Sequence, residues 1–303
     1  MTRASDTETF ARRADAPTRR VFLGGLAAVW AWPAGASDRP ARVVIAGGAL
    51  TEIAFALGAG DRIAGVDVTS NYPEAAAEKA QIGYFRSLAP EGLLALAPDL
   101  ILAEPEAGPA SALERVEAAG VPVLRGPDGE GPAATVDKIA FVGEALGLEA
   151  EAERAIARYR AQLAEVQAKV ARLPGRPKAL FVMSFAAGAP VVGGAGTSAD
   201  AILAEAGAVN VAASVEGWKP MSREAILAAA PDAVVMMTQG VERLGGEAEI
   251  LGRPDLSQTP AGRDGRLIAL EGMLLLGFGP RTPQAIAELA RALHPQDAAA
   301  AGL

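Results

Sequence analysis

The sequence has no cysteine and a single histidine, His294, near its end. The missing thiols exclude disulfides, thiolate metal sites, cysteine nucleophiles and a lipid anchor on cysteine. One histidine cannot build a multi-histidine zinc or manganese site, and a Ser-His-Asp triad would have to use that residue. Aromatic residues make up only 5% of the chain while Ala and Leu are abundant. An α/β or helical protein is therefore expected rather than a β-sandwich.

Positive charge is also scarce. The chain has 28 Lys and Arg against 36 Asp and Glu, a formal net charge of −8. Because no basic stripe follows the first 36 residues, nucleic acid is not an expected partner. A chain of 303 residues is long enough for one large domain or two lobes of ordinary size.

The first 36 residues have the pattern of an export signal. Arg19 and Arg20 precede Phe22, Leu23 and a mildly apolar run, which is typical of the twin-arginine pathway. The run is too short for a permanent membrane span, and the small residues at 34–36 suit a signal peptidase, so the mature chain is expected to begin at Ser37. Without this segment the net charge is near −10. No other stretch is long and apolar enough to span a bilayer, so a soluble periplasmic protein is expected.

Short apolar runs alternate with helical segments in the rest of the chain. The apolar runs predict strands at 42–46, 63–66, 100–103, 121–124, 179–183, 233–237 and 267–270. The helical segments lie at 50–57, 91–97, 109–119, 198–206, 222–229 and 282–293. This alternation predicts parallel sheets covered on both faces. Residues 148–173 contain no Gly or Pro and predict one long helix of about 25 residues, about 37 Å in length.

An internal repeat relates the two halves. Residues 91–102 and 224–235 are identical at six of twelve positions, at an offset of 133, and each copy predicts a short helix, a Pro-Asp stop and a strand. Their placement on either side of the long helix predicts an α/β protein of two Rossmann-like lobes joined by one backbone helix. The expected division is a signal peptide at 1–36, an N-terminal lobe at 37–147, the linking helix at 148–174 and a C-terminal lobe at 175–303.

Several local motifs occur in order between about residue 40 and about residue 293. They are residues 47–53, 67–70, 82–86 with Leu88 and 91–92, 181–184, 200–201, 259–262 and 276–279. Together with the two lobes, they resemble the helical-backbone class of periplasmic binding proteins and, within it, the haem receptors. The resemblance implies a monomeric carrier, not an enzyme, that binds haem b and hands it to an ABC permease dimer at the inner membrane.

The candidate iron ligands are three tyrosines and six methionines. Tyrosine is a recognised axial ligand of haem iron, and the resemblance places that ligand at Tyr84, with Arg86 beside it. In an extended segment residues two apart share a face, so Arg86 could reach the phenolic oxygen and favour phenolate over phenol. From the residues alone, a half-buried Tyr84 with a surface Arg86 remains the alternative. Tyr72 is a second expected haem contact, whereas Tyr159, a residue of the long helix, is expected to pack against a lobe or to be solvated.

The facing lobe is expected to contribute Met183, Phe185 and Arg243. Met183 and Phe185 end a strand, where clefts commonly form. Some haem receptors carry at the position of Phe185 a histidine that can bind a second haem. Phenylalanine cannot bind iron, so one haem is expected here. Arg243 is expected to pair with a propionate, with an ordinary surface arginine as the alternative.

Glu91 and Glu224 open the helices of the two repeat copies. Related receptors dock on arginines of the permease dimer through one acidic residue at the matching place in each lobe, and the resemblance implies this role here. Acidic residues at a helix start are also ordinary caps, and both descriptions can hold. Glu52 is less suited to docking.

Two other functions are compatible with parts of the sequence. A siderophore or corrinoid receptor of the same fold would make Tyr84 an ordinary cleft residue. A Rossmann-like enzyme could use residues 193–198 as a phosphate loop, but this segment lacks the Gly-Lys-Ser/Thr ending and the Gly-x-Gly-x-x-Gly spacing. Binding without turnover is therefore expected, with small lobe closure because the long helix restricts hinge motion.

Overall fold

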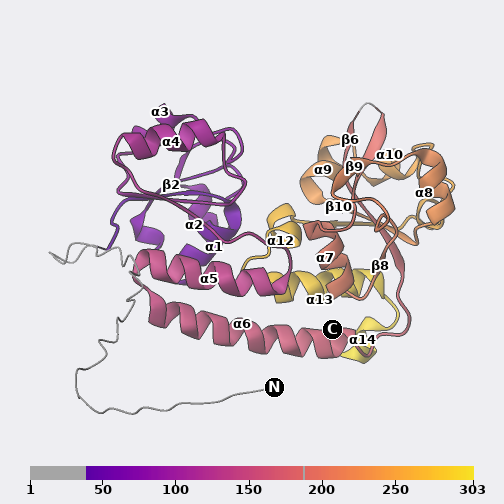
Figure 1. Cartoon of the computed structure of the whole chain (residues 1–303). Helices are drawn as coiled ribbons and strands as arrows, with labels where there is room; N and C mark the ends of the chain where they lie inside the picture. The colour runs from indigo at the N-terminus through magenta and orange to yellow at the C-terminus, as the bar shows by residue number, and fades with distance from the viewer. Residues whose placement is uncertain (1–38, 187) are drawn as a thin grey trace, which may run out of the picture. The chain divides into compact units, whose positions relative to one another are not determined.

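The computed structural model of the protein describes residues 39–186 and 188–303. The export signal predicted at 1–36 lies outside these residues. The described chain belongs to one compact unit that begins at Asp38 and contains two β-sheets (Figure 1). Every helix in the two described ranges is too short or too polar to cross a membrane.

The first sheet is wholly parallel, as predicted, with strand order β3-β2-β1-β4-β5. Its strands are β1 (Val43–Ala46), β2 (Ile63–Val66), β3 (Ala80–Gln81), β4 (Leu100–Ala103) and β5 (Val123–Arg125). The helical elements around it are α1 (Gly48–Ala56), η1 (Gly60–Arg62), α2 (Glu74–Ala77), α3 (Pro90–Leu94), α4 (Ala110–Ala118) and α5 (Pro132–Leu146). The central strands β1 and β4 are buried at every position. Their alternate residues enter two separate hydrophobic cores, one on each face of the sheet.

The second sheet is mixed, which corrects the prediction of parallel strands throughout. Its order is β11-β10-β6-β7-β9, and β8 also pairs with β6. Its strands are β6 (Lys178–Ala186), β7 (Ala189–Gly193), β8 (Val209–Asn210), β9 (Trp218–Pro220), β10 (Ala233–Met237) and β11 (Leu267–Leu270). The pairs β6–β7 and β7–β9 are antiparallel, because the chain turns back directly after β6, where Gly188 has a φ of +85°. The sequence pattern predicted a strand only at 179–183, so this hairpin was not predicted.

The remaining helices belong to the linker and the second lobe. They are α6 (Glu149–Val170), α7 (Ser198–Glu205), α8 (Arg223–Ala229), α9 (Thr238–Arg243), α10 (Glu247–Leu251), α11 (Pro260–Arg263), α12 (Gly272–Leu276), α13 (Thr282–Leu293) and α14 (Ala298–Ala301). The long helix predicted at 148–173 is α6, which has 22 residues. It packs on α5 and α13 (Figure 1). Tyr159 of α6 is buried in the first-lobe core, as expected, whereas Val166 enters the main core of the second lobe.

The internal repeat is confirmed by matching backbone details. Asp99 and Asp232 occupy the same place in the two copies, and each exchanges hydrogen bonds with a residue at the start of a neighbouring strand: Arg42, directly before β1, or Lys178, the first residue of β6. The Asp99 carboxylate accepts from the backbone N–H of Arg42 at 3.1 Å, and that of Asp232 accepts from Lys178 at 2.8 Å. The alanines two residues before each aspartate, Ala97 and Ala230, both have a positive φ, 45° and 48°. Each Pro-Asp stop therefore ends a helix and starts a strand in the same way.

Candidate functional site

A cavity of about 310 Å³ is lined by residues of both lobes. On the first-lobe side it is bordered by the start of α1, the turn at Phe85 and Arg86, and the loops that follow β4 and β5. On the second-lobe side it is bordered by Met183, Ser198, Trp218, Met273, Leu276 and Gly277. Most of the first-lobe segments follow the carboxyl ends of parallel strands, which is where open α/β sheets bind ligands.

Tyr84 directly precedes Phe85 and Arg86 of the cavity wall but is not itself one of the lining residues. It is 42% exposed, and the Nη1 of Arg86 donates a hydrogen bond to its hydroxyl oxygen at 2.9 Å. Phe85 and Arg86 line the cavity, and the Arg86 guanidinium lies 4.6 Å from the centre of the Phe85 ring. The predicted contact between Tyr84 and Arg86 is therefore confirmed, while the role of Tyr84 as an iron ligand stays a prediction.

The reason given for that contact was wrong. Residues 84–87 do not form an extended segment but a tight turn, closed by the backbone N–H of Ser87, which donates to the carbonyl of Tyr84 at 2.7 Å. Gly83 precedes it with a φ of +87°, a conformation that glycine adopts without strain. The turn is held at its far side because the backbone N–H of Gly108 donates to the Phe85 carbonyl at 2.9 Å. Tyr84 and Arg86 thus project from a fixed loop.

The strand-end residues of the second lobe separate onto two faces. Met183 lines the cavity, as predicted, but Phe185 packs on the opposite side of β6, with the Arg253 guanidinium 3.9 Å from its ring centre. An irregularity in the pairing of β6 with β7 between Val182 and Ser184 shifts the alternation by one residue. Without it, Met183 and Phe185 would share a face. The structure therefore does not bring Phe185 to the described cavity.

The other predicted site residues also lie outside the cavity lining. Tyr72 is 46% exposed, and the Arg281 guanidinium lies 3.6 Å from its ring centre. Arg243 is the exposed last residue of α9. Glu91 and Glu224 are exposed in the first turns of α3 and α8, as expected. Their roles toward haem or a permease are not tested by these positions.

The first-lobe wall of the cavity is acidic. Glu104 is 8% exposed and pairs with the buried Lys138 at 3.5 Å. Burial raises the pKa of Glu104, and Lys138 only partly offsets this effect. Burial also raises the pKa of Glu130, on the same wall, to about 7. Lys138 lowers this pKa, whereas repulsion from Glu106 and Asp128 raises it further. Because Glu130 as a residue is exposed, solvent screens part of these interactions.

Glu130→Gln is expected to change how stability depends on pH. A carboxyl whose pKa is raised in the folded state makes that state bind more protons than the unfolded chain, so its contribution to stability falls as pH rises from about 4.5 to about 7. The free energy of unfolding, from urea titrations at pH 5 and pH 7.5, should therefore favour the variant more at pH 7.5. Glu153→Gln, on the exposed side of α6, is the control. An equal difference at both pH values would contradict the shifted titration of Glu130.

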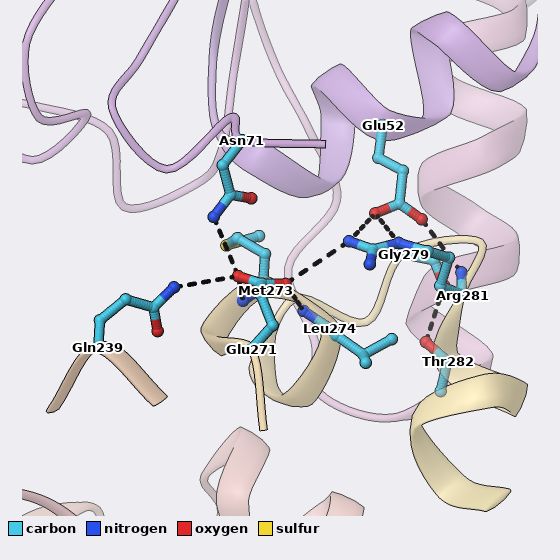
Figure 2. A network of polar contacts seen from close by, with 9 residues as sticks. All are labelled: Glu52, Asn71, Gln239, Glu271, Met273, Leu274, Gly279, Arg281 and Thr282. Atoms are coloured by element: carbon cyan, nitrogen blue, oxygen red, sulfur yellow. Dashed lines mark hydrogen bonds and ion pairs between the residues drawn. The ribbon is translucent and has the colours of Figure 1, made fainter. Parts of the chain in front are cut away.

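A polar network outside the cavity lining connects the lobes (Figure 2). Glu52 of α1 is buried, and its carboxylate faces the Arg281 guanidinium, with Nε and Nη2 both 2.9 Å from Oε2. The backbone N–H of Arg281 also donates to Glu52 Oε1 at 3.1 Å. Burial raises the pKa of Glu52, although Arg281 opposes this. Glu52 therefore serves as a contact between the lobes, while its lesser suitability for docking stays a prediction.

Glu271 extends the same network from the start of α12. It accepts from the backbone N–H groups of Met273 and Leu274 at 2.8 and 2.7 Å, and from the Asn71 side chain of the first lobe at 3.0 Å (Figure 2). Burial acts to raise the pKa of Glu271, but these hydrogen bonds and Arg281 hold the pKa below its ordinary value. We call Glu52, Asn71, Glu271 and Arg281 the interlobe clasp.

Two features of the site were not predicted from the sequence. The clasp joins residues that are 200 and 229 positions apart, and no local sequence pattern predicts such a pairing. Trp218 is a cavity residue that was not considered, although a signal existed. It follows Gly217, is the only tryptophan after residue 32, and is 37% exposed. The large ring of a tryptophan is normally buried, so one that is exposed beside a cavity indicates a ligand contact.

The two α/β lobes and the cavity that both of them line define a solute-binding receptor. The chain belongs to the periplasmic binding protein family, whose model matches residues 43–273. Its structure is similar to the periplasmic heme-binding protein RhuT from Roseiflexus sp. RS-1 in apo form, with 39% identity and a TM-score of 0.81 over 85% of this chain and 98% of that one.

Two further comparisons agree with this family. The periplasmic heme-binding protein BhuT, in complex with two hemes, matches with 39% identity and a TM-score of 0.78 over 83% of this chain and 98% of that chain. The uncharacterized ABC transporter substrate-binding lipoprotein YvrC of Bacillus subtilis (strain 168) is 29% identical over 234 residues, which cover 76% of this chain and 73% of that protein. The protein is thus similar to receptors of ABC importers rather than to enzymes.

Proposed function

We propose that this protein is the periplasmic haem receptor of a bacterial ABC importer. The observation that carries the proposal is the 42% exposed Tyr84 in the turn whose next two residues line the cavity, with the Arg86 guanidinium 2.9 Å from its phenolic oxygen. A phenolate is a suitable ligand for ferric iron. The similarity to two haem-binding proteins at 39% identity adds support.

In this proposal each residue has a simple task. Tyr84 donates its phenolate oxygen to the ferric iron, and Arg86 stabilises the phenolate by a charge-assisted hydrogen bond. The turn at 84–87 is already closed and anchored, so little ordering is needed when the ligand binds. Met183 contacts the porphyrin from the second lobe. The protein binds haem and releases it unchanged, since a carrier needs no chemical step.

The proposed stoichiometry is one haem b per chain. The described second-lobe lining of the cavity contains Met, Ser, Trp, Leu and Gly residues but no His or Tyr, so it offers no hard ligand for a second ferric iron. Tyr72, Phe185 and Arg243 remain predicted haem contacts that lie outside this cavity in the structure. Arg243 would have to reach a propionate from the end of α9.

Delivery and export complete the proposal. Glu91 and Glu224 would dock on arginines of the permease dimer, since both carboxylates are exposed at the starts of equivalent helices. The receptor would act as a monomer. Export would follow the twin-arginine pathway, because Arg19 and Arg20 precede an apolar run and small residues at 34–36.

The test is a competition between ligand classes. The chain from Ser37 onward is titrated with hemin and followed by absorbance, and cyanocobalamin and a ferric hydroxamate siderophore are then added as competitors. The proposal expects saturation at one hemin per chain with no displacement by either competitor. Saturable binding of cobalamin or siderophore, with hemin no tighter than to an unrelated acidic protein, would replace haem by the corrinoid or siderophore alternative on the same fold.

A further inference from the structure

The two walls of the cavity differ completely in charge. Six ionisable side chains line it, and all come from the first lobe: Arg86, Glu104, Glu106, Asp128, Glu130 and Lys138. The described lining from the second lobe contains no ionisable group and is mostly apolar, with Met183, Trp218, Met273 and Leu276. A ligand that fits both walls must be polar or coordinating toward one lobe and apolar toward the other.

Trp218 is the largest side chain of the apolar wall and is held in place. It begins β9, where it pairs with Gly193 of β7. Its indole makes an edge contact with the fully buried Phe181, with ring centres 5.7 Å apart. A Cβ on Gly193 would come within 2.9 Å of the indole ring, so glycine at that position leaves the space that the ring needs. Phe181 and the space at Gly193 therefore hold the Trp218 indole in place, while 37% of the residue stays exposed.

We propose that Trp218 is a specificity-determining residue, which stacks on the porphyrin face turned away from Tyr84 and selects flat, conjugated tetrapyrroles. This inference rests on the proposed function and adds the residue of the second lobe that determines ligand specificity. An indole face gains most from contact with another planar π-system. The polarizable thioethers of Met183 and Met273 suit the same apolar surface.

The same wall disfavours the alternative ligand. A corrin ring is puckered and carries amide side chains on both of its faces, so it cannot lie flat on an indole. Amides pressed against Met183, Trp218 and Leu276 would lose their hydrogen bonds to water with no polar side chain there to replace them, apart from Ser198. Trp218 thus separates porphyrins from corrins by shape and by desolvation.

The test uses metal-free protoporphyrin IX beside hemin, because it stacks but has no iron to be ligated. Trp218→Leu should weaken both ligands by a similar factor of about 10 or more, the expected value of a lost aromatic stack. Trp218→Phe should retain most of the affinity. Val209→Ala, at another exposed apolar residue of the second lobe that lies outside the cavity lining, is the control and should bind both ligands as the parent does. Thermal unfolding confirms that each variant is folded.

A direct reading of the contact is also possible. Trp218 is the only tryptophan in the chain from Ser37 onward, so labelling with 5-fluorotryptophan gives one ¹⁹F signal. Diamagnetic protoporphyrin IX should move this signal upfield by its ring current when it stacks on the indole. An unmoved signal, together with unchanged affinity of Trp218→Leu for both ligands, overturns the inference while leaving haem binding intact. Failure of the parent chain to bind either ligand would instead refute the proposed function.

Discussion

Tyr84→Phe is expected to weaken hemin binding by more than about 100-fold, or about 3 kcal/mol, and to remove the phenolate-to-iron charge-transfer band. Losing an outer partner of a metal ligand typically costs 10- to 100-fold in affinity, and loss of the ligand itself should cost more. The phenylalanine keeps the ring and its edge contact with Phe85, so the change isolates the oxygen atom. Affinity and spectrum are measured by absorbance titration of the chain from Ser37 onward.

Two controls make this result specific. Tyr72→Phe removes the hydroxyl of the other exposed tyrosine, whose ring lies beneath Arg281, and it should leave the spectrum unchanged. Metal-free protoporphyrin IX should bind Tyr84→Phe as it binds the parent, because no iron is present to be ligated. A Tyr84→Phe protein that keeps both the band and the affinity would mean that another group ligates the iron.

Arg281→Met is expected to lower the free energy of unfolding by about 3–5 kcal/mol, the usual cost of breaking a buried ion pair from one side. The side chains of Glu52 and Arg281 are only 7% and 16% exposed, so the variant leaves the Glu52 carboxylate buried without its counter-ion. Glu271 loses the same partner. Urea unfolding at pH 7, followed by circular dichroism, measures the difference.

The interlobe clasp also allows an internal check. In the double variant Glu52→Leu with Arg281→Met both charges are gone, and stability should recover in part because no unpaired buried charge remains. Arg154→Met breaks an exposed pair with Glu151 on α6, whose side chains are 61% and 40% exposed, and should change stability far less than Arg281→Met because solvent screens an exposed pair. Equal losses in Arg281→Met and Arg154→Met would show that the clasp contributes nothing special.

Most regular elements could be predicted because their signals are local. Four-residue apolar runs such as 63–66 and 100–103 match β2 and β4, since a strand buried on both faces must be apolar throughout. The repeat could be recognised because both copies need the same residues to end a helix and begin a strand. A Pro-Asp stop places an aspartate where it can accept from the neighbouring strand.

The missed elements depend on distant partners. Helix α5 was overlooked because Gly143 and several β-branched residues weaken its pattern. In the structure a Cβ on Gly143 would collide with Ala152 of α6, so glycine is needed there for close helix packing. The irregular pairing at Met183 likewise arises from β7 and not from the sequence of β6. Phe185 was assigned to the cleft because simple alternation takes no account of such a shift.

In the candidate site, too, contacts between residues close in sequence could be predicted, whereas those between distant residues could not. Tyr84 and Arg86 are two residues apart, so their contact could be expected even though its geometry was misjudged. Trp218, Met183 and Met273 come from β9, β6 and α12 and form one wall only after the second lobe has folded. The charge difference between the two walls is likewise a property of the assembled cavity.

Resonance Raman spectroscopy of the hemin complex, excited in the charge-transfer band, tests the central claim most directly. The chain from Ser37 onward contains three tyrosines, and ring-deuterated tyrosine identifies their modes. The account predicts a ferric high-spin haem with iron-bound tyrosinate modes that shift on deuteration and vanish in Tyr84→Phe. A six-coordinate low-spin spectrum without tyrosinate modes, or one unchanged in Tyr84→Phe, would contradict it.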